Sequence, residues 1–245
     1  MESVYKKIIE NIKSYIIVLD IDNNIIYRNN DFVFELFHNN KENLNEITLN
    51  DKTYSVDYIK IDNNVIQIYN DITKYKLEIR KLKRDYLTDL YNRFAIIEKL
   101  EELKGTQYTL IMGDIDHFKR INDGYGHLVG DYVLKGISEL LVKHIGKDGI
   151  VGRYGGEEFL IIIPTLKIEE AYNLIENIRK LIEKTKIKVK YNDCIKEFYV
   201  SMTFGLTNSD INKSINEIIG EADNALYTGK HNGRNQSNIY KKDED

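Results

Sequence analysis

Two adjacent glutamates follow a pair of glycines between two apolar segments, and this stretch constrains the fold more than any other. It runs from 150 to 163 and reads Ile-Val-Gly-Arg-Tyr-Gly-Gly-Glu-Glu-Phe-Leu-Ile-Ile-Ile. Gly155 and Gly156 predict a tight hairpin whose two central residues have positive φ. That turn would place Glu157 and Glu158 at the start of a buried strand, where two carboxylates are costly unless a cation lies on them. Taken alone, the pattern fits a charged hairpin tip as well as a functional site.

The composition indicates a soluble globular protein of one large or two small domains. The chain has 245 residues, of which 42% are hydrophobic and 30% charged, and its net charge of -4 gives no basic footprint for nucleic acid. Cys194 is the only cysteine, so a disulfide within the chain is impossible and a cysteine-based zinc site is disfavoured. No apolar run has the length of a membrane span and no signal-peptide pattern opens the sequence. We therefore expect a cytoplasmic protein without a membrane segment.

The first 71 residues alternate short strands and short helices. Apolar residues at helical spacing predict an opening helix: Val4, Ile8, Ile9 and Ile12. The elements expected after it are strands at 15–20 and 25–28, a short helix at 32–37, a polar stretch at 39–49, and a second hairpin at 53–59 and 65–69. This order resembles a PAS sensor domain, which implies a sensor and dimerisation role for residues 1–71. The segment between the second and third strands is short for such a domain, so no organic cofactor is predicted. His38 is a conceivable haem ligand, but an exposed histidine at a helix end is the preferred interpretation.

A helical linker is expected over residues 72–85. Its apolar residues are spaced three, four, three and four apart, as in the seam of a coiled coil: Ile72, Tyr75, Ile79, Leu82 and Tyr86. Two heptads are too few to hold a coiled coil alone, but they can align two chains that other surfaces bring together. The favoured interpretation is a homodimer through the linker and the N-terminal domain. The alternative is an amphipathic helix that packs on its own domain.

The second domain, residues 86–245, opens with a helix at 94–103 and a buried strand at 108–113 that runs into Asp114-Ile115-Asp116. A strand that ends in Asp-x-Asp is one way to place a carboxylate on a divalent cation at the end of a sheet. Hard oxygen ligands suit Mg²⁺ or Mn²⁺. The alternative is an aspartate that caps the next helix.

A glycine-rich segment follows at 117–131, between a short helix and a longer one. Backbone N–H groups after Asp116 can face a phosphate, and Lys119 adds positive charge. Asn122 and Asp131 offer the donors and acceptors that a guanine edge requires, because a carboxylate can accept from both N1–H and the 2-amino group.

The rest of the chain is expected to form helices at 166–183 and 215–227 and strands at 187–191 and 195–206. The second of these helices ends in a basic, glycine-rich turn. Its Lys230 and Arg234 can neutralise a triphosphate. The alternative is that they only compensate the dipole at the helix C-terminus.

Four motifs occur in a fixed order: strand-Asp-x-Asp, Asn...Gly-His-x-x-Gly-Asp, Gly-Gly-Glu-Glu-Phe and Lys...Gly-Arg-Asn. Together they resemble the GGDEF family of diguanylate cyclases over residues 85 to about 240, and Gly-Gly-Glu-Glu-Phe is one of the two accepted active forms of its signature. The resemblance implies an α+β fold class, with a palm-like domain whose central sheet is flanked by helices. It also implies that two such domains face each other, each with one GTP. The 3′-hydroxyl of one GTP attacks the α-phosphate of the other, twice, to give cyclic di-GMP and two pyrophosphates.

The resemblance also implies a role for each matching residue. Asp114 and Glu157 would ligate the metals, assisted by the Ile115 carbonyl; Glu157 would help to deprotonate the 3′-hydroxyl, and Glu158 is the second signature acid. The implied substrate-binding groups are Asn122 and Asp131 for guanine, the backbone near Phe118 and Lys119 with Lys230 and Arg234 for the phosphates, and Gly155 and Gly156, which let the backbone approach the nucleotide.

One departure from the family pattern concerns product inhibition. Many members carry Arg-x-x-Asp just before the hairpin, where product binds, whereas this chain reads Gly146-Lys147-Asp148-Gly149. We therefore predict no product inhibition through this primary site. Two other functions stay open: a catalytically inactive GTP-binding regulatory module, and a relaxed cyclase that makes mixed cyclic dinucleotides. The retained acids argue against the first and Asp131 against the second.

Overall fold

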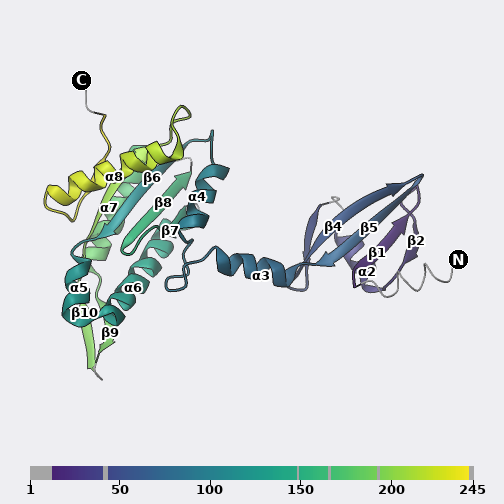
Figure 1. Cartoon of the computed structure of the whole chain (residues 1–245), viewed down its shortest axis with the longest axis horizontal. Coiled ribbons are helices and arrows are strands. Elements are labelled where there is room, and N and C mark those ends of the chain that lie inside the picture. The colour runs from purple at the N-terminus through teal and green to yellow at the C-terminus, as the bar shows by residue number, and fades with distance from the viewer. Residues whose placement is uncertain (1–12, 41–43, 148, 165–166, 192–193, 243–245) are drawn as a thin grey trace. The chain divides into compact units, whose positions relative to one another are not determined.

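The computed structural model describes residues 13–40, 44–147, 149–164, 167–191 and 194–242 (Figure 1). Contacts divide the chain into two compact units, Met1–Leu82 and Lys83–Asp245, which are described separately here. The helix expected around Val4 to Ile12 lies outside the described residues.

The first unit is built on a five-stranded antiparallel sheet of order β2-β1-β5-β4-β3. Its strands are β1 (Tyr15–Leu19), β2 (Ile25–Arg28), β3 (Glu46–Leu49), β4 (Lys52–Ile61) and β5 (Asn64–Asp71). Helix α2 (Phe32–Asn39) lies between β2 and β3 in the chain and buries Val33 and Leu36 against Ile17, Tyr54 and Tyr69. His38 is exposed, and its Nδ1 lies 2.9 Å from the Phe34 carbonyl oxygen.

Strand β3 was not expected, because the sequence around it is polar. Asn50 and Asp51 have φ values of 51° and 60° and form a two-residue turn between Leu49 and Lys52. This is the geometry of the primed turns that join hairpin strands, which asparagine and aspartate tolerate. The Asn-Asp pair was therefore the sequence signal for the missing strand.

The linker helix is shorter than the apolar spacing predicts. Helix α3 spans Thr73–Leu82, so Ile72 and Tyr86 lie outside it. The helical part of the predicted seam therefore ends at Leu82. The chain turns instead after Leu82, where Arg84 pairs with Tyr91 in a β-bridge. α3 has no buried residue, but it touches the sheet of the first unit through Lys76, 2.8 Å from Glu46, and through Thr73, so both interpretations of the linker stay predictions.

The second unit contains a five-stranded sheet of order β12-β11-β6-β8-β7, and a separate two-stranded sheet of β9 and β10. All neighbouring strands are antiparallel except β11 and β12. The strands are β6 (Tyr108–Ile115), β7 (Ile150–Arg153), β8 (Glu158–Pro164), β9 (Ile187–Tyr191), β10 (Cys194–Phe198), β11 (Met202–Asn208) and β12 (Ser237–Ile239). The helices are α4 (Arg93–Glu102), α5 (Phe118–Tyr125), α6 (His127–Ile145), α7 (Ile168–Lys184) and α8 (Ile215–His231).

Helices cover both faces of the main sheet (Figure 1). Ile111 of the central strand β6 belongs to the core that contains α6 and α7, whereas Leu110 and Met112 belong to the core that contains α4 and α8. This alternation is the period-two pattern of a strand covered on both sides. The expected α+β arrangement of a central sheet flanked by helices is therefore confirmed for the second unit.

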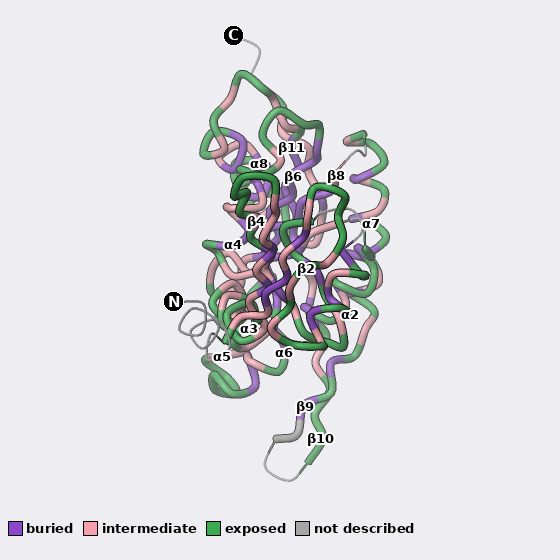
Figure 2. Tube along the Cα trace, turned by 90° about the vertical axis from the view of Figure 1, so that its right-hand side faces the viewer, coloured by how far each residue is buried: buried purple, intermediate pink, exposed green. Residues whose placement is uncertain are grey.

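The single strand expected at 195–206 is wrong, because the chain leaves one sheet for another within it. β10 pairs with β9 in the small hairpin, and β11 begins at Met202 in the main sheet. Residues Cys194 to Glu197 are exposed, as Figure 2 shows for this hairpin. Strand β12 was not expected, because a parallel neighbour has no turn signal in the local sequence. Within the described ranges, the model contains no helix with the length and apolarity to cross a bilayer.

Candidate active site

The glutamate hairpin differs from the tight turn that the glycine pair predicts. β7 ends at Arg153 and β8 begins at Glu158, so residues 154–157 form the loop, and neither Gly155 nor Gly156 has a positive φ. Glu157 therefore lies in the loop and only Glu158 lies in the strand. The Glu158 carbonyl oxygen accepts from the N–H groups of Tyr154, at 2.8 Å, and Gly155, at 3.3 Å, which closes the longer loop.

The side chain of Arg153 bonds to the backbone of the 154–157 loop. The Arg153 guanidinium donates through Nη2 to the Gly156 carbonyl oxygen at 2.7 Å and through Nη1 to Asp85 Oδ1 at 3.1 Å. Burial would raise the pKa of Asp85, but hydrogen bonds from Thr88 and the charge of Arg153 outweigh it and hold that pKa below its usual value. A charge-assisted bridge thus links the segment after α3 to the backbone beside Glu157.

Asp114 lies opposite the hairpin on the central strand. It is 5% exposed, and it pairs in register with Glu158 on β8 and with Thr203 on β11. Its Oδ2 is 2.8 Å from Lys230 Nζ. Lys230 is in the last turn of α8, which runs to His231 rather than ending at Tyr227 as expected.

Glycine makes this contact possible. A Cβ at Gly229 would lie 2.7 Å from Thr203 Cγ2, so α8 approaches β11 closely just before Lys230. Because Thr203 is the register partner of Asp114, the lysine of the helix and the aspartate of the strand are brought together. The structure therefore unites Asp114 and Lys230, two residues that lie far apart in the sequence.

The two predicted metal ligands repel each other. Burial raises the pKa of Asp114, although Lys230 partly opposes this. Burial also raises the pKa of Glu157, and the negative charge of Asp114 raises it further. Carboxyl groups in this state favour a nearby cation, since it relieves both the desolvation and the repulsion.

The donor set fits a divalent cation that also binds substrate. Asp114 and Glu157 supply two carboxylates, and hard oxygen donors of this kind suit Mg²⁺ or Mn²⁺. Among the residues that the structure describes, no group of three or more His, Cys, Asp or Glu side chains surrounds a common point. Mg²⁺ is commonly held by one or two carboxylates plus phosphates and water, so two protein carboxylates suffice for such a site.

Asp116, the second acid of Asp-x-Asp, is committed elsewhere. Its carboxylate accepts from Ser201 Oγ at 2.6 Å, Thr203 Oγ1 at 2.7 Å and the Asn235 N–H at 3.0 Å. His117, not Asp116, is the N-cap of α5, so the helix-cap alternative is wrong. We did not expect these partners, because each lies at least 85 residues away in the chain.

The predicted guanine-binding residues lie where α5 packs on α6. A Cβ at Gly130 would lie 2.0 Å from Asn122 Oδ1, so the asparagine side chain rests on the residue before Asp131. Asn122 Oδ1 is buried and has no hydrogen-bond partner within the part of the chain that the structure describes. Asp131 is half-buried.

The remaining predicted phosphate groups lie at two element ends. Phe118 is the first residue of α5, after His117 in a left-handed conformation, and Lys119 is exposed in its first turn. N–H groups of a first helical turn have no partner within the helix. Arg234 is exposed in the turn after α8, with a φ of 63°.

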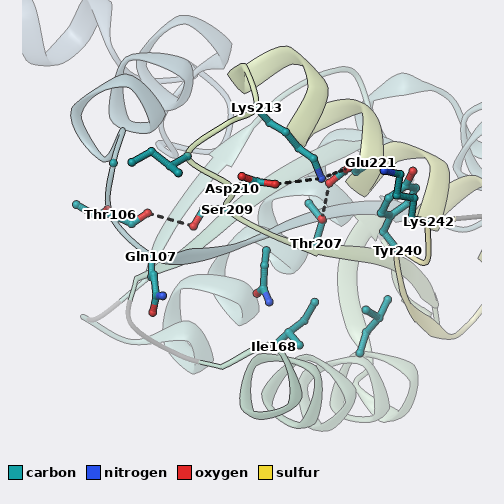
Figure 3. A pocket seen from close by; sticks show the side chains of 14 residues that line it. Thr106, Gln107, Ile168, Thr207, Ser209, Asp210, Lys213, Glu221, Tyr240 and Lys242 are labelled. Carbon is teal, nitrogen blue, oxygen red and sulfur yellow. Dashed lines mark hydrogen bonds and ion pairs between the residues drawn. The ribbon is translucent and has the colours of Figure 1, made fainter.

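A cavity of about 680 Å³ lies at the other end of β6 and contains none of these residues (Figure 3). It is lined by the residues before Tyr108 and the end of β11. Its Lys213 contacts Glu221 at 2.5 Å, and Glu221 also accepts from Thr207 at 2.9 Å, so these partly buried charges are paired with each other. The chemistry of the chain is thus concentrated at the hairpin end of the sheet.

Comparison with known proteins decides the family. The model of the diguanylate cyclase GGDEF domain matches residues 82–236. The chain belongs to the GGDEF family. It is 37% identical over 173 residues to diguanylate cyclase VdcA of Vibrio cholerae, a match that covers 68% of this chain and 50% of VdcA. The chain spans about half the length of several curated relatives that it matches.

Solved GGDEF structures share the fold of the second unit. The coiled coil and GGDEF domain of DgcB from Caulobacter crescentus, in complex with c-di-GMP, matches with a TM-score of 0.63 and 28% identity, covering 68% of this chain and 90% of that one. A structure of the active GGEEF domain of a diguanylate cyclase from Vibrio cholerae matches with a TM-score of 0.50 and 32% identity, covering 61% and 90%. The expected GGDEF fold is confirmed, whereas no family match supports the PAS-like assignment of the first unit.

Proposed function

We propose that this protein is a diguanylate cyclase that condenses two GTP molecules into cyclic di-GMP and two pyrophosphates. One observation carries the proposal: Asp114 and Glu157 form a mutually repelling carboxylate pair, with Lys230 2.8 Å from Asp114, at the signature hairpin. Such a site suits a cation and a polyphosphate together. The curated relative VdcA and the active GGEEF domain of the Vibrio cholerae cyclase add support.

In the proposed reaction, each chain binds one GTP and presents it to a second chain. Asn122 Oδ1 accepts from the guanine 2-amino group, which satisfies its buried lone pairs, and Asp131 accepts from the same edge. Lys230, Arg234 and the N-terminal amides of α5 hold the phosphates. The Gly155-Gly156 loop leaves room for the nucleotide, because a Cβ at Gly156 would meet nothing within 4 Å.

Asp114 and Glu157, with the Ile115 carbonyl, would hold Mg²⁺ or Mn²⁺. When bound, such an ion polarises the phosphoryl oxygens and stabilises the charge that develops on them. Glu157 accepts a proton from the 3′-hydroxyl, which attacks the α-phosphorus as pyrophosphate leaves. Glu158, whose carboxylate folds over Gly155, completes the acidic side of the loop.

The first unit is proposed to be a PAS-like sensor that regulates the cyclase within a homodimer. Its antiparallel sheet, with α2 between β2 and β3, supports a sensor-type fold. Exposed apolar residues of the predicted seam, on and after α3, support contact with a second chain: Tyr75, Leu82 and Tyr86. The signal stays undefined, and the cytoplasmic location stays a prediction.

The experiment that tests the proposal incubates purified protein with Mg²⁺ and GTP, ATP or both, and identifies products by mass spectrometry. We expect cyclic di-GMP from GTP alone and no product from ATP alone. A mixed dinucleotide would favour the relaxed cyclase. GTP binding without any product would favour the inactive regulatory module.

Replacement of the proposed base provides a sharper test. Glu157→Gln keeps the size of the side chain but removes its charge, so synthesis should fall by at least about 10²-fold, as expected for loss of a general base. The matched control is Glu169→Gln, an exposed residue in the first turn of α7, which should leave synthesis unchanged. Unchanged turnover in Glu157→Gln would contradict the mechanism.

A further inference from the structure

The turn that carries Arg234 has an unusual backbone. Gly233, Arg234 and Asn235 are consecutive and all left-handed, with φ values of 109°, 63° and 47°. Non-glycine residues occupy this region at a cost, so the surrounding structure must hold the turn in place. The contacts of Asn235 show what holds it.

Asn235 is held by hydrogen bonds of both its backbone N–H and its side chain. Its N–H donates to Asp116 Oδ2 and to Thr203 Oγ1, both at 3.0 Å, which ties the turn to the end of the central strand. Its side-chain Oδ1 accepts from Arg179 Nη1 at 2.5 Å, and its Nδ2 donates to Glu183 at 2.8 Å. Both partners of the side chain belong to α7.

Arg179 is itself fixed. The residue is 8% exposed, and its Nε and Nη2 donate to the two oxygens of Glu176 at 2.8 and 3.1 Å. The same Glu176 accepts from Ser237 Oγ at 2.7 Å, just beyond the turn. A planar fork held on one edge by a carboxylate presents its remaining N–H groups in a defined direction. In this protein the remaining Nη1 group points to Asn235.

We infer that Arg179 is a positioning residue for triphosphate binding, which acts by holding Asn235 and thereby the left-handed turn that presents Arg234. The inference rests on the proposed function, because Arg234 is the group proposed to bind phosphate. Arg179 itself is buried, and among the described residues its hydrogen-bond partners are Glu176, Glu183 and Asn235, not Lys230 or the signature loop. Asp116 plays the matching part from the strand side, which gives the second acid of Asp-x-Asp a role apart from the metal.

A double-mutant cycle tests this. The probe is 3′-deoxy-GTP with Mg²⁺, which lacks the attacking hydroxyl and cannot be condensed, and binding to the full chain is measured by titration calorimetry. Arg179→Lys keeps the charge but cannot span Glu176 and Asn235, so affinity should fall about tenfold. Arg234→Ala should weaken binding at least as much. The combined variant should bind no more weakly than Arg234→Ala alone, because Arg179 acts through Arg234.

Two further variants separate positioning from general stability. Asn235→Gly tolerates the left-handed backbone and keeps the N–H bond to Asp116, but it removes the acceptor for Arg179, so it should reproduce the loss of affinity. Lys184→Ala removes an exposed cation in the last turn of α7 and should bind like the wild type. Thermal melting confirms that each variant is folded.

The outcomes distinguish this inference from the proposed function. Losses that multiply in the double mutant, or an Asn235→Gly variant with wild-type affinity, would overturn the inference while GTP binding by the wild type still supports the function. A wild-type chain that binds neither GTP nor 3′-deoxy-GTP would overturn both.

Discussion

At the scale of single residues, Asn122 illustrates how packing prepares a binding group. Its Oδ1 is buried without a partner and lies against Gly130, where even a methyl group would stand 2.0 Å away. An unsatisfied buried acceptor costs about 1–3 kcal/mol. A guanine amino group that bonds to this oxygen would satisfy it, so substrate binding would recover that cost.

Gly130→Ala should therefore weaken GTP binding. The new Cβ displaces the Asn122 amide, and the loss of one hydrogen bond of roughly 1.4 kcal/mol corresponds to about a tenfold rise in KM. The matched control is Gly124→Ala in α5, where a Cβ meets nothing within 4 Å. This control should keep the wild-type KM and gain up to about 1 kcal/mol of stability. Equal KM values for the two variants, from initial rates against GTP, would refute the role of Asn122.

At the scale of elements, the bridge from Asp85 through Arg153 to Gly156 joins the segment after α3 to the signature loop. Both side chains are largely buried, with exposures of 15% and 13%. The three residues that follow α3 thus belong by their contacts to the second unit, which begins at Lys83.

The stability that this bridge supplies should depend on pH in a defined direction. The pKa of Asp85 is lowered in the folded state, so its contribution is present above the unfolded pKa of about 3.9 and is lost as the pH falls through the folded value. Asp85→Asn should cost about 1–3 kcal/mol at pH 7, the usual loss for a hydrogen bond to a charged group. Urea unfolding followed by circular dichroism should show this difference shrinking below pH 4. A difference that is the same at pH 3 and pH 7 would argue against the bridge.

The turn between α6 and β7 bears on product inhibition. Gly146 stands where the family pattern has its arginine, and it lines a cavity of about 620 Å³ together with Lys147 and Arg84. The Arg84 guanidinium donates to the Asp89 carbonyl oxygen at 2.9 Å, and Lys147 is a point charge that cannot form the paired hydrogen bonds of an arginine to phosphate. Added cyclic di-GMP at micromolar concentration should thus change the rate by less than about twofold, because the arginine of the Arg-x-x-Asp pattern is replaced by Gly146. Strong inhibition in this titration would show that another site binds product.

At the scale of the whole molecule, the proposed reaction requires two chains. Each signature loop holds one nucleotide, so specific activity should rise with protein concentration until the dimer is saturated. The exposed seam residues of α3, Tyr75 and Leu82, are the expected contact.

Negative charges introduced on the predicted seam should weaken the dimer and so lower the specific activity. Tyr75→Glu combined with Leu82→Glu should lower specific activity and shift the protein to monomer in analytical ultracentrifugation. The residues are 61% and 76% exposed, so neither substitution disturbs a core. Leu77→Glu, 53% exposed on the same helix but off the seam, is the control. Full activity of the double variant at low concentration would contradict dimerisation through α3.

The sequence alone determined the family, the order of the motifs and most elements of the catalytic unit, because these depend on local apolar periodicity and on residues that are close together in the chain. It did not determine the conformation of the signature loop, which is a longer loop bonded to Arg153 instead of a tight glycine turn. Nor did it determine where α3 ends, because the chain there turns so that Arg84 pairs with Tyr91. Nor did it show that Asp116 and Arg179 support the Arg234 turn. The Arg234 turn depends on hydrogen bonds between residues distant in the chain, which the packing of α7 and α8 on the sheet brings within reach. The signature loop depends on Arg153, whose guanidinium also bonds to Asp85, 68 residues away.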